Sequence, residues 1–256
     1  MTALVRAEWT KLTTTRVWMG LLLGACLMAG GFAALFTGLA GTEGGPPPVG
    51  SSEYESLAFS VASNGVVFAL ILGIIGMTQE FRHRTATPTF LTTPKRGRVV
   101  VAKLLAYALA AVPFALAVLA VTVAVVLVYA GARGAAPSFT SENTQVLLNA
   151  GLAIVVYAVI GVGLGALLRN QVGAIVGALV YLYVVEPLLS AFSATAAVYK
   201  WLPGGALEAM TTTFRGGPAA VAPDLLERWQ GGLLLLGYGL VAALLGTLLA
   251  IRRDVV

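Results

Sequence analysis

The chain has 256 residues, of which 58% are hydrophobic and only 11% are charged. A soluble domain carries about 25% charged residues, so this chain has too little polar surface to cover a globule in water. The composition therefore predicts an integral membrane protein. The net charge of +5 lies in a few connections between apolar segments, and we expect no nucleic acid partner.

Residues 1–16 are too short and too polar to cross a bilayer. Val5, Trp9 and Leu12 recur at helical spacing, whereas Arg6, Glu8 and Lys11 fall elsewhere on the helix. This pattern predicts an amphipathic helix that lies on the membrane surface and contacts lipid. The alternative is a basic flank that only fixes the orientation of the first span.

Six apolar segments follow, and each is long enough to cross a bilayer as a helix. A hydrocarbon core about 30 Å thick needs about 20 helical residues, whose backbone amides must be satisfied within the segment. The expected spans cover residues 17–40, 57–78, 104–130, 146–168, 172–192 and 231–251. We expect one all-α transmembrane domain over residues 1–256, with the first span retained rather than cleaved as a signal peptide.

Lys and Arg are distributed unequally between the two sides of this arrangement. Of the sixteen Lys and Arg residues, only four fall on the side opposite the termini: Arg133, Lys200, Arg215 and Arg228. Because cytoplasmic connections are enriched in Lys and Arg, we expect both termini and the 79–103 loop to be cytoplasmic.

The 79–103 loop combines its cations with Thr87-Pro88 and Thr93-Pro94. Thr is a favourable N-cap and Pro is tolerated in the first helical turn, so each pair can begin a helix. Phe90 and Leu91 would then be large apolar residues on a short cytoplasmic element that docks a partner. The alternative is a basic loop that touches only anionic lipid headgroups.

Two features are expected near the outer face. Glu186-Pro187 lies inside the fifth span, where a carboxylate is costly and usually functional, and where Pro predicts a kink or a break. Glu186 could line a substrate path or donate a proton. Alternatively, it lies near the outer end of the span, where it reaches the interface or pairs with a free backbone donor. Residues 193–230 predict short interfacial or re-entrant helices, broken at Gly204-Gly205 and resuming from Pro223 through Trp229.

The sequence carries none of the common catalytic motifs. There is no G-x-x-x-x-G-K-[ST] phosphate loop, no G-x-S-x-G nucleophile elbow and no H-E-x-x-H metal motif, and His83 is the only histidine. We expect no catalytic, metal or cofactor site in this chain. The energy for any transport would then come from another protein.

Two stretches resemble one family of membrane proteins. The run QEFRHRTATPTFLTTPKRGRVVVAKLLAY, residues 79–107, and the opening ALVRAEWTKLTTTRVWMG resemble ABC-2 type permeases of bacterial ABC exporters, in the actinobacterial group whose ATPase is a separate polypeptide. Six spans with both termini inside also match that group. The resemblance covers most of the chain and says little about cargo.

The resemblance implies a non-enzymatic permease subunit of the bacterial cell membrane. It implies two permease halves, expected here as two copies of this chain, and a cytoplasmic ABC ATPase that binds ATP and Mg. The loop after the second span would contact that ATPase, the substrate path would lie between the halves, and the outer helices would map to 193–230. The residues expected in ATPase coupling are Glu80, Phe81, Arg82, Arg84, Thr87, Pro88, Phe90 and Leu91.

Two other functions are compatible with the same features. A membrane scaffold, such as an immunity or sensor component, would bind a partner through the same loop and move nothing. An ion-coupled transporter would depend on Glu186, but it usually needs several charged groups within its spans.

Overall fold

The structure is a computed structural model that describes residues 1–82, 96–211 and 225–252. Its described part is helical. The first half contains α1 (Thr2–Thr14), α2 (Val17–Leu39), α3 (Ser52–Ser60), the 3-10 turn η1 (Val61–Asn64), α4 (Gly65–Arg82) and α6 (Arg96–Ala132). The second half contains α7 (Ser141–Leu168), α8 (Gln171–Val180), the π-helix η2 (Tyr181–Val185), α9 (Glu186–Ala191), α10 (Ser193–Tyr199), α11 (Pro203–Thr211) and α12 (Arg228–Arg252).

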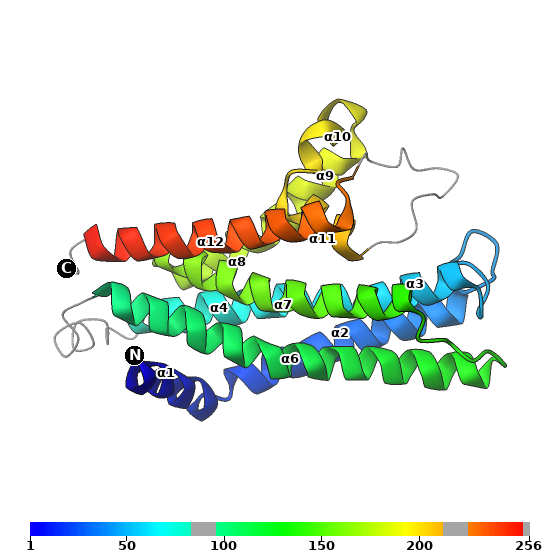
Figure 1. Ribbon diagram of the computed structural model, residues 1–256, viewed down its shortest axis with the longest axis horizontal. Coiled ribbons are helices and arrows are strands. Elements are labelled where there is room, and N and C mark those ends of the chain that lie inside the picture. The colour runs from blue at the N-terminus through cyan, green and yellow to red at the C-terminus, as the bar shows by residue number, and fades with distance from the viewer. Residues whose placement is uncertain (83–95, 212–224, 253–256) are drawn as a thin grey trace.

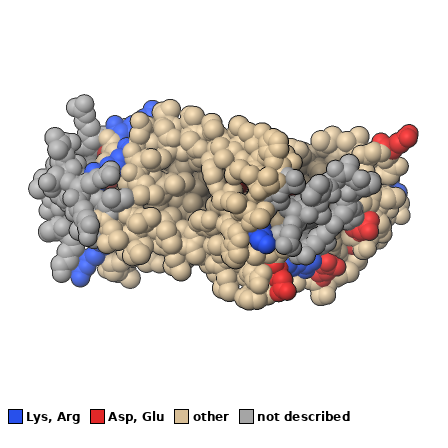
Figure 2. All heavy atoms as spheres, turned by 90° about the horizontal axis from the view of Figure 1, so that it is seen from above, with Lys and Arg blue, Asp and Glu red and all other residues tan. Residues whose placement is uncertain are grey.

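Six helices in the described residues are long and apolar enough to cross a membrane, which confirms the predicted span count. Helices α2, α4, α6, α7 and α12 run along one common direction, whereas the fifth segment turns away from it at α9, and α1, the N-terminus and the end of α12 lie at the same end of the bundle (Figure 1). We call this the termini end; the α2–α3 and α6–α7 connections lie at the far end. In the view of Figure 2, Lys and Arg gather at the termini end, Asp and Glu gather toward the far end together with some Lys and Arg, and a surface without charged residues lies between the two.

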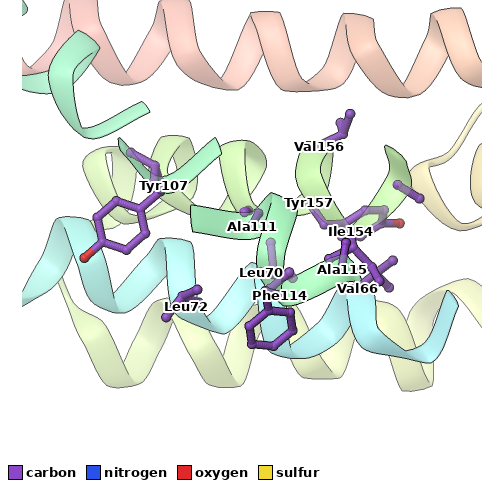
Figure 3. Close-up of a cluster of buried hydrophobic side chains, with 14 of the residues drawn as sticks. Val66, Leu70, Leu72, Tyr107, Ala111, Phe114, Ala115, Ile154, Val156 and Tyr157 are labelled. Carbon is purple, nitrogen blue, oxygen red and sulfur yellow. The ribbon is translucent and has the colours of Figure 1, made fainter. Parts of the chain in front are cut away.

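Helices α4 and α7 form the centre of the bundle and approach each other closely. A Cβ atom on Gly161 would lie 2.2 Å from the carbonyl oxygen of Leu70, and one on Gly73 would lie 2.1 Å from that of Ala158. Small residues permit this contact between backbones in a lipid environment. Side chains from α4, α6 and α7 complete the core beside it, as Figure 3 shows.

The helices extend beyond several predicted span ends. The second span is the continuous segment Ser52–Arg82, and the third begins at Gly97 and reaches Ala132. Polar residues near these helix ends lower the local hydropathy, so the predicted spans stop short of the ends. In the structure, capping and contacts between helices satisfy these polar residues. The Ser51 side chain, for example, accepts a hydrogen bond from the Tyr54 amide at the start of α3.

The predicted break at Gly204-Gly205 is wrong, because α11 begins at Pro203 and runs through both glycines. Pro is favourable in a first helical turn, and the missing side chains allow close contacts there. A Cβ atom on Gly205 would lie 2.1 Å from the Tyr199 carbonyl oxygen. The helix predicted through Trp229 also begins later than expected, at Arg228; Pro223 and Asp224 lie outside the described residues.

Of the kink or break expected at Pro187, the break is not found. The segment Gln171–Ala191 is helical throughout, and its irregularity is the π-helical turn η2 immediately before Glu186. The Glu186 amide donates to the Tyr181 carbonyl, five residues back. The wider turn absorbs the constraint that Pro187, which has no N–H to donate, places on the helix.

Candidate functional site

Four charged side chains meet inside the termini end of the bundle, and we call them the ion cluster: Glu8, Lys11, Glu80 and Lys103. They come from α1, α4 and α6, which are far apart in sequence. Lys103 has no exposed surface, and Glu8 and Glu80 are each 4% exposed. Two carboxylates and two ammonium groups therefore balance each other in a place from which water is largely excluded.

The distances within the ion cluster are those of strong ion pairs. Lys103 Nζ lies 2.5 Å from Glu8 Oε2 and 3.0 Å from Glu80 Oε1. Lys11 Nζ lies 2.7 Å from an oxygen of each of the same two carboxylates. Each ammonium thus bridges both carboxylates, and the cluster joins α1 to α4 and α6 at once.

Lys103 has a further contact with α4, at Gly76. Its ammonium also donates to the Gly76 carbonyl oxygen, at 3.2 Å. A Cβ atom on Gly76 would lie 2.0 Å from the ring of Tyr107, which is itself 2% exposed. The close packing of Tyr107 on Gly76 therefore positions the first turns of α6 against the last turns of α4.

Lys11 is the most exposed member of the cluster. Partial burial by itself lowers the pKa of the Lys11 ammonium, but the hydrogen bonds and charges of Glu8 and Glu80 outweigh burial, and the net shift is upward. Lys11 therefore stays charged at neutral pH, and α1 is held by a full ionic contact.

The structure places only some of the residues expected in ATPase coupling. Glu80 lies inside the bundle, in the ion cluster, while Arg82 is exposed at the end of α4. The Arg169 guanidinium lies over the Phe81 ring, 5.3 Å from the ring centre. Arg82 Nη1 lies 3.5 Å from Gln171 Oε1. The other expected residues lie outside the described residues: Arg84, Thr87, Pro88, Phe90 and Leu91.

The residues predicted to form the apolar face of the N-terminal helix separate in the structure. Val5 and Leu12 pack against the core, and Leu12 is 7% exposed. Trp9 keeps 39% of its surface exposed. The side of α1 that faces the bundle therefore also carries Glu8, which the spacing of apolar residues did not predict.

A second site lies between α4, α7 and α9 to α11, and we call it the polar cavity. Its volume is about 330 Å³. Two carboxylates line it, Glu186 and Glu208, together with tyrosine, serine and asparagine side chains. No Lys, Arg or His is among its lining residues in the part of the chain that the structure describes.

Neutral donors hold both carboxylates of the polar cavity. Glu186 is 3% exposed, and its Oε1 accepts a hydrogen bond of 2.9 Å from the Gly204 amide. The Tyr199 hydroxyl donates to Glu208 Oε2 at 2.8 Å. The expected pathway residue Glu186 and its neighbour Pro187 thus both line a cavity.

An apolar groove of about 400 Å³ adjoins the polar cavity. It lies between α7, α8 and α12, and nearly all of its lining is apolar. Tyr157 and Leu182 line both hollows, so the two are neighbours. Tyr157 is 1% exposed, and its hydroxyl has no hydrogen-bond partner in the described part of the chain.

Sequence reasoning missed several residues that complete these sites, namely Glu8, Lys103, Tyr157, Tyr199 and Glu208. One usable signal was Lys103 itself, which stands in the apolar run VVVAKLLAY and needs a buried partner. The spacing of Glu8 and Lys11 by three residues was another. The tyrosines carry no comparable signal, because isolated tyrosines are common in membrane helices.

Comparison with known proteins gives one family match. Residues 4–185 match the family model described as ABC-2 family transporter protein. The match includes most of α1 and the whole ion cluster, and it stops inside the fifth span, one residue before Glu186. No curated protein matches the chain.

Proposed function

The chain belongs to the ABC-2 family of transporter membrane proteins, and from this premise we propose that it is the permease subunit of an exporter driven by a separate ABC ATPase. The family implies an ATPase partner. In this proposal the partner binds ATP and Mg, and this chain performs no chemistry itself. It supplies the path through the membrane and receives the movement of the ATPase.

The observation that carries the proposal is the position of the ion cluster. Glu80 lies two residues before the end of α4, and Lys103 lies in the second turn of α6, so the cluster clamps both flanks of residues 83–95. The same cluster holds α1. A push on the intervening segment would therefore move α1, α4 and α6 together, which a transporter driven from one side requires.

The surface beside this clamp is the proposed docking place. Arg82 is exposed there, and we assign it to ATPase contact together with Arg84, Thr87, Pro88, Phe90 and Leu91. Glu80 acts as a positioning residue inside the bundle. Trp9, on the exposed side of α1, suits contact with lipid headgroups, where Trp is enriched.

The distribution of charge supports the orientation. Lys and Arg gather at the termini end, so we place this end in the cytoplasm of a bacterial cell and the far end outside. Large apolar side chains remain exposed on α2, α8 and α12. Lipid covers part of this surface, and a second copy of the chain covers the rest, with the substrate path between the halves and the polar cavity beside it.

Co-purification with the ABC ATPase and measurement of its activity test the proposal. We expect Arg82→Glu combined with Phe90→Ala to weaken the complex and to abolish ATPase stimulation by the permease. Arg16→Glu is the matched control, because Arg16 is also exposed on α1–α2 near the termini end but lies outside the proposed docking surface.

Three outcomes would contradict parts of this proposal. An intact complex with normal stimulation in the double variant would remove the docking assignment. A complex that binds ATPase but moves no cargo when ATP is supplied would favour a scaffold. Transport that follows the proton or sodium gradient rather than ATP would favour an ion-coupled carrier.

A further inference from the structure

Among the described residues that line the polar cavity, two are carboxylates and none is a cation. The Gly204 amide donates to Glu186 and the Tyr199 hydroxyl donates to Glu208, and both donors are neutral. This differs from the ion cluster, where each carboxylate meets two ammonium groups. Glu186 is buried, and a buried carboxylate without a cation is costly unless a positive group joins it.

Aromatic rings add a second feature that favours a cation. Tyr157, Tyr183 and Tyr199 line the polar cavity, and Tyr181 and Tyr238 line the adjoining apolar groove. The face of a tyrosine ring attracts an organic cation, and the attraction grows when water is excluded. A quaternary or protonated amine would therefore gain from both the carboxylates and the rings.

The Tyr157 hydroxyl is the independent sign that a ligand belongs here. It is buried, it has no partner in the described residues, and its side chain stands where the polar cavity meets the apolar groove. A buried hydroxyl without a partner is unusual in a folded protein. A polar atom of a ligand that passes from one hollow to the other would satisfy it.

We propose that this chain binds a cationic amphiphile, with its amine head in the polar cavity and its apolar tail in the apolar groove. We take this amphiphile to be the cargo, and that part of the inference rests on the proposed export function; binding itself does not. The same chemistry occurs in a soluble amphiphilic amine and in an amine-bearing lipid, so the experiment must separate these two sources.

Equilibrium binding of radiolabelled dodecyltrimethylammonium to the full chain in electrically neutral nanodiscs tests the proposal. Loss of one charged contact weakens binding about tenfold or more, so we expect at least this loss in Glu186→Gln and in Glu208→Gln. Tyr157→Phe removes only one oxygen atom and should weaken binding by a smaller factor. Glu53→Gln, an exposed carboxylate at the far end, is the matched control and should bind as the unmodified chain does.

Competitors define the ligand class. Unlabelled tetramethylammonium, which has the charge without the tail, and dodecyl sulfate, which has the tail with the opposite charge, should both compete far less well than the unlabelled probe. A two-chain cationic lipid added to the nanodisc separates the sources: competition by the lipid identifies a lipid site, and its failure identifies a site for soluble amphiphiles.

Equal binding by the Glu186→Gln, Glu208→Gln double variant and the unmodified chain would overturn the proposal, as would strong competition by dodecyl sulfate. If Glu186→Gln does not fold, Glu208→Gln and Tyr157→Phe still decide the question, since neither side chain caps a backbone group. Amphiphile binding is measured without nucleotide and is therefore independent of the ATPase. If the chain binds no amphiphile but still stimulates the ATPase normally, this inference is wrong and the proposed function stands.

Discussion

Lys103 shows how one residue determines the local structure of this protein. Its ammonium is fully buried and touches two carboxylates and a backbone carbonyl. Removing one partner from a buried ion pair leaves an uncompensated charge, which costs more than replacing the whole pair. The stability of the cluster therefore depends on its being complete.

Lys103→Met should destabilise the protein by about 3–5 kcal/mol, because Glu8 and Glu80 would then share only Lys11. The measurement is thermal unfolding of the purified chain in detergent. Lys11→Met is the control; its side chain is 40% exposed, so water can replace part of the lost contact and the loss should be smaller.

The double variant Glu8→Gln, Lys103→Met adds a stricter comparison. It removes one charge of each sign, so it should be more stable than Lys103→Met alone if the two groups are coupled. If the double variant loses as much stability as the sum of the losses in Glu8→Gln and in Lys103→Met, the two side chains are not coupled.

Sequence alone could predict the spans but not these contacts. A bilayer imposes its length on each helix locally, so hydropathy within one segment is sufficient to find it. Lys103 and Glu8 are 95 positions apart, and Lys11 and Glu80 are 69 positions apart. Such pairings are set by how helices pack, which a single sequence does not state. Glu186 was recognisable because a lone carboxylate in a span is costly, whereas its partner Gly204 was interpreted as a helix break.

At the scale of helices, the contact between α4 and α7 depends on the absence of side chains. The backbones approach where Gly73 faces Ala158 and Gly161 faces Leu70. Lipid tails are as apolar as leucine, so helices in a bilayer gain from close packing rather than from leaving water. A methyl group at this crossing must push the two helices apart.

Gly161→Ala should therefore cost about 1–3 kcal/mol and lower the unfolding temperature, since the added Cβ would meet the Leu70 carbonyl oxygen at 2.2 Å. Size-exclusion chromatography over a heating series measures the loss of folded protein. Gly20→Ala is the matched control in α2, where a Cβ would meet nothing within 4 Å. Equal behaviour of the two variants would contradict the close crossing.

At the scale of the whole molecule, the fold divides its charge between two ends. The termini end contains α1, the ion cluster and the α7–α8 turn, while the far end contains α3 and the α6–α7 connection. The far end is also held together: Glu55 accepts hydrogen bonds from Ser138 and Asn143, which lie in that connection and at the start of α7. Both ends are therefore ordered, but only the termini end joins α1 to the flanks of residues 83–95.

Cysteine labelling tests the orientation that this charge division implies. Cys26 is the only cysteine, so Cys26→Ala gives a background without thiols. In it, Thr10→Cys and Glu43→Cys place exposed thiols on α1 and in the α2–α3 connection. Because basic ends remain in the cytoplasm, a maleimide that does not cross membranes should label Glu43→Cys in intact cells, and Thr10→Cys only after permeabilisation.

The reverse pattern would place the ion cluster and the proposed ATPase surface outside the cell, where no ATP-driven partner could reach them. Labelling of both thiols in intact cells would place both on the outer side, which requires an even number of membrane crossings between them and contradicts α2 as a full span.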